Sequence, residues 1–472
     1  MKPKTKPYRN LVVVVGMFLL GFGIAGAKAD SLYITEDAQT APTPNPDGSS
    51  SLTIHSNTIK RFDASTGDYQ GVFVTNENCP NYELNLNTNV YTPIPASASS
   101  ASAPPAGCLY GPTSLVFDGS GHLLVANQNV NLPVNGAIDE YNAQTGAFVK
   151  ELVSYSDTNA PPAPRGMVLY NGILFVASLA GVQPGMACNL NDTQPPAGVS
   201  GNGCVQAFDA STGIFLYFLI SPPDLAATSS FHPRGVVIGP DGLLYVSNTP
   251  EGTAAKIGPA GIGGQILVYD PKKPTLPPTT FVGTETETCN LEASPPCEFN
   301  RPEGLVFGPD GNLYVTSFQG TTPDPTVPYD TDKILIFAGP GEPSPGSFIG
   351  QIVLDSNSAD QTQRASAQAL LFGPNDELFV PVNRTTTDFS SVAADVRLYD
   401  VLPRSFSPNQ TTFTSFVTSD DSGQVLSGQP LTAAEYLTFG NTDPATLAYQ
   451  PQGNQGNQGN QGGNQGGNQG GN

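Results

Sequence analysis

The stretch HPRGVVIGPDGLLYVSN, residues 232–248, decides the fold because two short apolar runs lie on either side of a tight turn. The runs are rich in Val, Leu and Tyr, which favour strands. Between them, Gly-Pro-Asp-Gly supplies the positive φ angles that a tight hairpin needs. We therefore expect these residues to form a β-hairpin, since a helix of this length would not be interrupted by such a turn.

This strand–turn–strand phrase recurs along the chain. Its copies are GPTSLVFDGSGHLLVAN (111–127), APRGMVLYNGILFVAS (163–178), HPRGVVIGPDGLLYVSN (232–248), RPEGLVFGPDGNLYVTS (301–317) and SAQALLFGPNDELFVPVN (366–383). Their openings are spaced by 52, 69, 69 and 65 residues. A period of this size predicts a repeat architecture in which each copy is one supersecondary unit.

A second strand pair follows each copy and also turns at Asp, Gly or Pro. It occurs as KRFDASTGDYQGVFV (60–74), AIDEYNAQTGAFVKELV (137–153), VQAFDASTGIFLYFLI (205–220), QILVYDPKKP (265–274), KILIFAGPGEP (333–343) and DVRLYDVLP (395–403). Four strands in each of six units predict an all-β, six-bladed β-propeller with inserted loops.

The first unit lacks an opening strand of its own. The sequence SLYITEDA at 31–38 matches the second strand of the other copies, whereas AEYLTFGNTDPATLAY at 434–449 matches an opening strand and its turn. We therefore expect a C-terminal strand to complete the first blade and close the ring, which removes open sheet edges. The predicted domain covers residues 30–450.

The two ends of the chain have different compositions. Residues 1–29 begin with four basic residues (Lys2, Lys4, Lys6 and Arg9), followed by an apolar run from 11 to 25 and Ala-Lys-Ala before Asp30, which predicts a signal peptide. A retained anchor helix is the alternative, but the run is shorter than the roughly 20 residues of a membrane span. Residues 451–472 repeat Gly, Asn and Gln, which predicts a disordered tail, with surface attachment as the functional alternative.

The net charge of the chain limits the classes of molecule that it can bind. The 472 residues include 19 Lys and Arg against 40 Asp and Glu, giving a net charge of −21. A chain this acidic lacks the basic patch that nucleic-acid binding requires, so we exclude nucleic acid as a partner. No segment after the N-terminal run is apolar enough to predict a membrane span.

The cysteines predict disulfides, because an exported chain meets oxidising conditions and its cysteine count is even. The six form sequence-local pairs: Cys79 with Cys108, Cys188 with Cys204, and Cys289 with Cys297. Six cysteines allow 15 connectivities; we favour neighbour pairing because each pair closes a loop without an expected strand. Zinc is the alternative, although the chain has only three histidines and no C-x-x-C.

The phrase P-x-G, an apolar run, GPDG and LYV resembles NHL-repeat propellers and the related SMP-30/gluconolactonase-like and streptogramin-lyase-like propellers. The resemblance covers residues 31–449 and implies a six-bladed propeller. It leaves function open, because this superfamily includes lactonases, lyases and non-catalytic binding modules.

The first strand of a blade lines the central channel, so the residue after each opening Pro, or its equivalent, is a candidate site residue. These residues are Thr113, Arg165, Arg234, Glu303, Gln368 and Glu435. Six-fold geometry places Arg165 opposite Gln368, Arg234 opposite Glu435, and Thr113 opposite Glu303. We expect the arginines to bind an anionic group, with Glu303 or Glu435 as a general base. A self-compensating ring of ion pairs is the alternative.

The resemblance adds two enzymatic hypotheses. Lactonase-like propellers hold a divalent metal, commonly calcium, at this mouth, where Glu435 and Glu303 match ligand positions and the two arginines do not. Lyase-like propellers use a channel-facing histidine, for which His232 is the candidate, with a structural role as the alternative.

The long insertions and the predicted disulfides lie on the mouth that carries these residues, and repeat proteins concentrate insertions on their binding face. We therefore predict an exported protein, periplasmic, extracellular or at the cell surface, that binds a small anionic ligand, a glycan or a protein at this mouth. A metal-dependent lactonase or lyase is the alternative.

Overall fold

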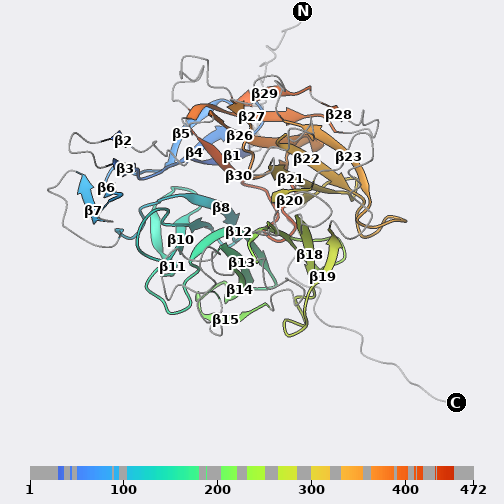
Figure 1. Ribbon diagram of the computed structural model, residues 1–472, viewed down its shortest axis with the longest axis horizontal. Coiled ribbons are helices and arrows are strands. Elements are labelled where there is room, and N and C mark those ends of the chain that lie inside the picture. Colours follow the sequence, from blue (N-terminus) through green and yellow to red (C-terminus); the bar gives the residue numbers. More distant parts are fainter. Residues whose placement is uncertain are drawn as a thin grey trace, which may run out of the picture.

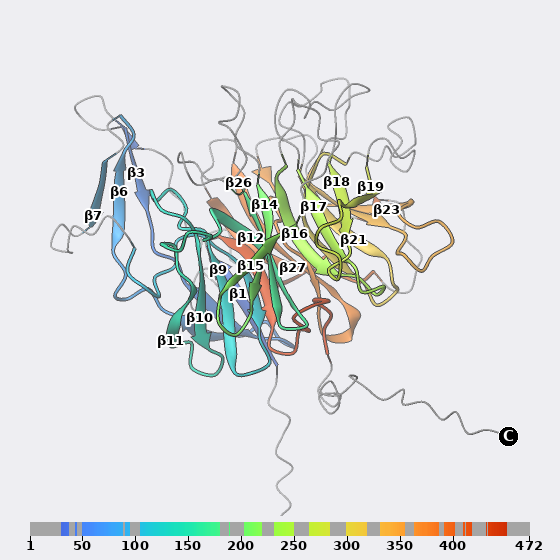
Figure 2. The same ribbon diagram turned by 90° about the horizontal axis from the view of Figure 1, so that it is seen from below.

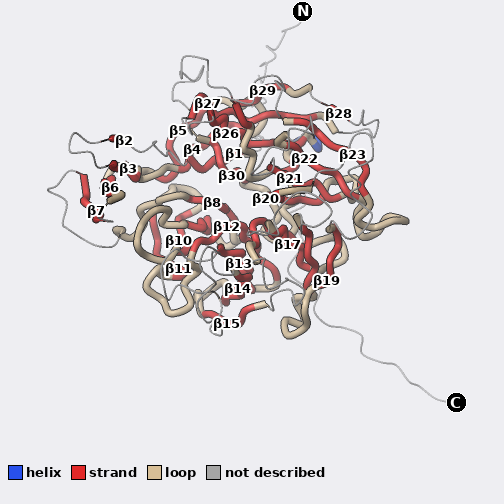
Figure 3. Tube along the Cα trace, viewed as in Figure 1, coloured by secondary structure: helices blue, strands red, loops and turns tan. Residues whose placement is uncertain are grey.

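The computed structural model describes residues 30–36, 43–44, 50–87, 90–94, 104–179, 188, 203–219, 231–249, 264–283, 299–318, 331–354, 363–386, 391–401, 409–410, 412–417, 431 and 433–450. These residues are strands, turns and loops, with one short 3₁₀ helix, η1 (Pro374–Asp376) (Figure 3). Within them, no helix is long and apolar enough to span a bilayer. The predicted signal peptide, the tail and the pair Cys289–Cys297 lie outside the described residues.

The described strands form seven sheets. Three of them contain β30 (Ala434–Phe439), β1 (Ser31–Glu36), β4 (Ile59–Asp63) and β5 (Tyr69–Val74); β8 (Pro112–Phe117), β9 (His122–Asn127), β10 (Ala137–Asn142) and β11 (Phe148–Val153); and β12 (Ala163–Tyr170), β13 (Ile173–Leu179), β14 (Cys204–Asp209) and β15 (Phe215–Phe218). Each repeat phrase thus supplies the first two strands of a sheet, and the phrase after it supplies the other two.

The next three sheets follow in chain order. They contain β16 (Pro233–Ile238), β17 (Leu244–Asn248), β18 (Gln265–Tyr269) and β19 (Thr279–Val282); β20 (Arg301–Phe307), β21 (Leu313–Phe318), β22 (Lys333–Phe337), β23 (Phe348–Val353) and β28 (Asn409–Gln410); and β24 (Gln363–Arg364), β25 (Leu371–Phe372), β26 (Leu378–Thr386), β27 (Ser391–Tyr399) and β29 (Thr414–Val417). The sheets follow one another around a common centre, which defines a β-propeller (Figure 1).

Glycines let the first strands of neighbouring sheets approach one another at this centre. A Cβ atom on Gly166 would lie 2.6 Å from the Arg234 carbonyl oxygen, and one on Gly235 would lie 2.6 Å from the Glu303 carbonyl oxygen. The Gly of Pro-x-Gly is therefore required by close backbone approach. The same approach places the preceding residue of each copy near its neighbours.

The Asp-Ala-Ser-Thr-Gly turns join the outer parts of neighbouring sheets. In one of them, Asp209 Oδ1 accepts hydrogen bonds from the Thr212 backbone N–H at 2.9 Å and from its hydroxyl at 2.8 Å. Gly213 follows at φ +73° and lies so close to the Leu152 carbonyl of β11 that a Cβ atom would overlap it. Gly146 and Gly67 make the equivalent contacts with Phe73 and Phe416, so the turn motif sets the spacing between sheets.

The first sheet takes its first strand from the C-terminal part of the chain. β30 pairs antiparallel with β1, with Leu32 opposite Phe439 and Tyr33 opposite Thr438. The Tyr436 backbone N–H also donates to Thr35 Oγ1 at 3.0 Å. On its other sides β30 packs against β8 and β26, so the first and sixth sheets are neighbours.

Residues 440–450 differ from the sequence expectation, which extended the strand–turn–strand phrase to Tyr449. They form a further turn of the Asp-Ala-Ser-Thr-Gly kind, since Asp443 Oδ1 accepts from the Thr446 N–H at 2.8 Å. The carbonyls of Pro444 and Ala445 accept from the backbone N–H groups of Leu169 (2.8 Å) and Ile238 (3.0 Å). This turn therefore covers the ends of β12 and β16 that lie away from their Pro-x-Gly openings.

The seventh sheet corrects a second expectation. Residues 76–111 were expected to form an insertion without regular structure, but β6 (Asn81–Asn85) and β7 (Val90–Ile94) pair there and join β3 (Ser50–Ile54) and β2 (Thr43–Pro44). Figure 2 shows this sheet standing to one side of the others. Its apolar face, with Ile54, Tyr82 and Leu84, packs against Tyr110 and Leu132.

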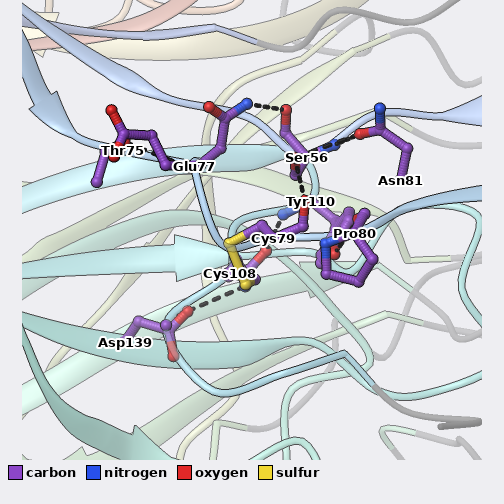
Figure 4. Close-up of a disulfide and its surroundings, with 12 residues drawn as sticks. Ser56, Thr75, Glu77, Cys79, Pro80, Asn81, Cys108, Tyr110 and Asp139 are labelled. Atoms are coloured by element: carbon purple, nitrogen blue, oxygen red, sulfur yellow. Dashed lines mark hydrogen bonds between the residues drawn. A yellow bond between two sulfur atoms is a disulfide. The ribbon is translucent and has the colours of Figure 1, made fainter. Parts of the chain in front are cut away.

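The disulfide Cys79–Cys108 joins this inserted sheet to the second sheet, as the neighbour pairing predicts (Figure 4). Around it, the Tyr110 hydroxyl donates to the Pro80 carbonyl at 2.6 Å, and the Gly111 N–H donates to Asn57 Oδ1 at 2.7 Å. The predicted pair Cys188–Cys204 is also bonded.

The sixth copy of the phrase departs from the pattern. Its first strand, β25, has two residues where the alignment predicts a run from residue 366, and η1 replaces the hairpin turn. The sequence there is Ala-Gln-Ala instead of Pro-x-Gly, and Ser366 has φ +47°, so the backbone is not extended at the opening. Gln368 nevertheless reaches the centre of the propeller.

Candidate functional site

Five of the six predicted site residues meet Tyr436 or one another at the centre of the propeller. Arg165 Nη1 donates to Gln368 Oε1 at 2.8 Å, which confirms that these side chains face each other. Gln368 Nε2 in turn donates to Glu435, whose other oxygen accepts from Asn383 Nδ2 at 3.3 Å. We call Arg165, Arg234, Glu303, Gln368, Glu435 and Tyr436 the central cluster.

Arg234 and Glu303 form the ion pair of this cluster. Arg234 Nε lies 3.7 Å from Glu303 Oε1, and the two side chains are only 8% and 2% exposed. Glu303 Oε2 is also buried, and no described group makes a hydrogen bond to it. The pair therefore joins the openings of β16 and β20 and leaves one carboxylate oxygen available.

Arg165 is surrounded by neutral partners. With the Gln128 amide oxygen turned toward the guanidinium, Gln128 accepts from Arg165 Nε at 2.9 Å and from Nη1 at 3.3 Å. The Tyr436 side chain is a further hydrogen-bond partner. Among the described residues, no carboxylate makes a salt bridge with Arg165, which is partly exposed. Hydrogen bonds therefore hold the Arg165 guanidinium in position, but none of its described partners carries a negative charge.

The electrostatic environment keeps Arg165 charged and Tyr436 protonated. Burial by itself lowers the pKa of Arg165, but Tyr436 and the Glu303 and Glu435 carboxylates outweigh it and raise that pKa. Burial raises the pKa of the Tyr436 phenol, Arg165 opposes the change, and Glu303 adds to it. The cluster therefore offers a guanidinium and a neutral hydroxyl side by side.

Tyr436 is the main functional candidate that the sequence argument missed. It occupies the third position of the opening phrase, where Gly166, Gly235 and Gly304 stand in other copies. That departure was a signal in the sequence: a glycine needed for close backbone approach has been replaced by a large polar side chain. Gln128 and Asn383 carried no such signal, because Gln128 directly follows β9 and Asn383 lies within β26, away from the Pro-x-Gly positions.

Thr113 and His232 make local structural contacts. The Thr113 hydroxyl lies 3.0 Å from the Pro164 carbonyl oxygen and ties β8 to β12. His232 is buried, its backbone N–H donates to Asn248 Oδ1 at 2.9 Å, and its carbonyl accepts from the Thr249 N–H at 3.1 Å. Neither contact requires a ligand.

The residues at the predicted metal position do not fit a divalent cation. Glu435 uses both oxygens as acceptors of amide N–H groups, and Glu303 is paired with a guanidinium. Calcium takes six to eight oxygen ligands. Within the described part of the chain, no three His, Cys, Asp or Glu side chains are grouped as metal ligands are.

No family model and no curated protein sequence matches the chain. Among solved structures, the periplasmic gluconolactonase PpgL of Pseudomonas aeruginosa is similar at 14% identity and a TM-score of 0.42, covering 87% of this chain and 98% of that one. A hypothetical selenium-binding protein of Sulfolobus tokodaii is similar at 10% identity and a TM-score of 0.43, covering 89% and 96%. We draw no functional inference from likenesses at these scores.

Proposed function

We propose that this chain is an exported, six-bladed β-propeller that binds a small anionic ligand at its central cluster. Six of the seven sheets contain strands of the repeated phrases, which supports six blades, whereas the sheet β2–β3–β6–β7 is built from insertions on either side of β4 and β5. The pairing of β30 with β1 supports closure of the ring between the sixth and first blades.

Two features support export. The basic, apolar and small-residue order of residues 1–29 is typical of a secretory signal. The disulfides Cys79–Cys108 and Cys188–Cys204 are of the kind that persist in oxidising compartments.

The binding proposal rests on the hydrogen bonds and the charge of Arg165. A partly buried guanidinium held by Gln128, Gln368 and Tyr436 has its position fixed while its charge lacks an adjacent carboxylate. Guanidinium groups bind carboxylates with two parallel hydrogen bonds, and fixing the group beforehand lowers the entropic cost of binding. Tyr436 adds a neutral donor at the same place.

Titration calorimetry with acetate and inorganic phosphate tests the proposal on the wild-type chain, Arg165→Gln and the control Arg61→Gln. Arg61 is an arginine of β4 outside the central cluster. Losing one charge-assisted hydrogen bond costs about 1.5–3 kcal/mol, so Arg165→Gln should weaken anion binding roughly 10- to 100-fold. Equal affinity in all three proteins would contradict the proposal.

A further inference from the structure

The central cluster contains an acceptor that its own residues do not use. Glu303 is 2% exposed, its Oε1 faces Arg234 at 3.7 Å, and its Oε2 has no hydrogen-bond partner among the described residues. A buried carboxylate oxygen without a donor is unfavourable, and native structures rarely keep one without a reason. A donor supplied by a bound ligand would satisfy it.

Charge balance indicates which donor fits. Arg165 and Arg234 carry two positive charges, and Glu303 and Glu435 carry two negative charges, so the four groups balance without a ligand. A simple anion bound to Arg165 would leave one excess negative charge in a poorly solvated place, within a chain whose net charge is already −21. A ligand that brings its own positive charge avoids this excess.

The placement of the groups agrees with this requirement. Arg165 and Glu303 are the third residues of β12 and β20, and the close backbone approach at Gly166 and Gly235 brings the starts of β12, β16 and β20 together. A guanidinium without a carboxylate partner and a carboxylate oxygen without a donor therefore share one small region. Each lacks the group that the other end of a zwitterion would provide.

We propose that the ligand is a compact amino acid, whose carboxylate binds Arg165 and whose ammonium group donates to Glu303 Oε2. This inference rests on the proposed function and narrows the ligand from small anions in general to carboxylates that also carry an ammonium group. Arg234 is the positioning residue, because its ion pair with Oε1 holds the Glu303 carboxylate in place.

The experiment compares three amino acids of increasing length, namely glycine, β-alanine and 4-aminobutanoate, with analogues that lack one charge. N-acetylation removes the positive charge, a hydroxyl in place of the amine keeps a neutral donor, and the primary amide removes the negative charge. Binding is measured by calorimetry on the wild-type chain and on Glu303→Gln, with Glu303→Asp as the second variant if the glutamine form does not fold.

At least one of the amino acids should bind 10-fold or more tightly than its N-acetyl and hydroxy analogues, and in Glu303→Gln the ratio between these affinities should fall to about one. Equal binding of the amino acid and the N-acetyl form would overturn the inference and leave the anion site intact. Equal binding of the hydroxy analogue would overturn the need for a positive charge. If no carboxylate of the panel binds, both this inference and the proposed function fail.

Discussion

The buried carboxyl of Asp139 predicts how the stability of the chain depends on pH. It lies on β10 and is 1% exposed, and Asn127 Nδ2 donates to its Oδ2 at 2.9 Å. Burial raises its pKa from 3.8 to about 7, a change that the Asn127 hydrogen bond opposes and the Glu151 charge increases. Asn127 also donates to the Cys108 carbonyl at 2.9 Å, which connects Asp139 to the surroundings of the disulfide drawn in Figure 4.

The sign of the pH dependence follows from this shift. Between pH 3.8 and about 7 the folded chain holds a proton on Asp139 that the unfolded chain has lost, so the free energy of unfolding falls as the pH rises through this range. At 1.36 kcal/mol per pH unit the ionised group costs at most about 4 kcal/mol above pH 7. Asp139→Asn keeps the shape and an acceptor for Asn127 and removes the charge.

We therefore expect Asp139→Asn to match the wild type near pH 4 and to exceed it in stability by up to about 4 kcal/mol at pH 8. Urea unfolding of both proteins at intervals from pH 4 to pH 8, with the disulfides intact, measures this difference. A difference that does not grow with pH, or a variant that is less stable at pH 8, would refute the reasoning.

Three further predictions concern the scaffold and the central cluster. Gly213→Ala should lower the free energy of unfolding by at least about 2 kcal/mol, because its Cβ would overlap the Leu152 carbonyl. Gly119→Ala also has φ +73° but nothing within 4 Å of its Cβ, so it should lower the free energy of unfolding by only about 1 kcal/mol. Urea unfolding measures the difference between the two variants. Replacing Cys79 and Cys108 together by Ser should lower stability by about 3 kcal/mol and speed proteolysis between residues 76 and 111, measured by mass spectrometry; unchanged cleavage there would contradict the bracing role. Chelator treatment should leave the melting temperature of the purified chain unchanged, because Glu303 and Glu435 face guanidinium and amide donors; a drop reversed by calcium would count against that view.

The repeated phrases made most of the fold predictable. Alternating apolar runs and turn residues fix strands locally, and the Asp-x-x-Thr-Gly turns encode their own hydrogen bonds, so no distant partner was needed to recognise them. The sheet β2–β3–β6–β7 was missed because its strands come from two separate insertions, and their pairing is set by packing against Tyr110 and Leu132. The 440–450 turn was missed because Leu447 has φ +56° where the other turns have Gly.

The site was predictable only as a set of positions. The periodicity placed Arg165 and Gln368 across from each other, and the structure has them in contact. It did not show that Thr113 would bond to the Pro164 carbonyl, or that Gln128 and Tyr436 would surround Arg165. Those contacts depend on side-chain reach across the centre, which a repeat alignment does not contain.

We propose Arg165 as the anion-binding group of the propeller. The most direct measurement is the ¹H–¹⁵N spectrum of the arginine Nε–H groups during a titration with glycine and with acetate, the Arg165 resonance being assigned by its loss in Arg165→Gln. We expect a saturable shift of the Arg165 resonance and no shift of the Arg61 resonance. A titration that moves other arginines and leaves Arg165 unchanged would contradict it.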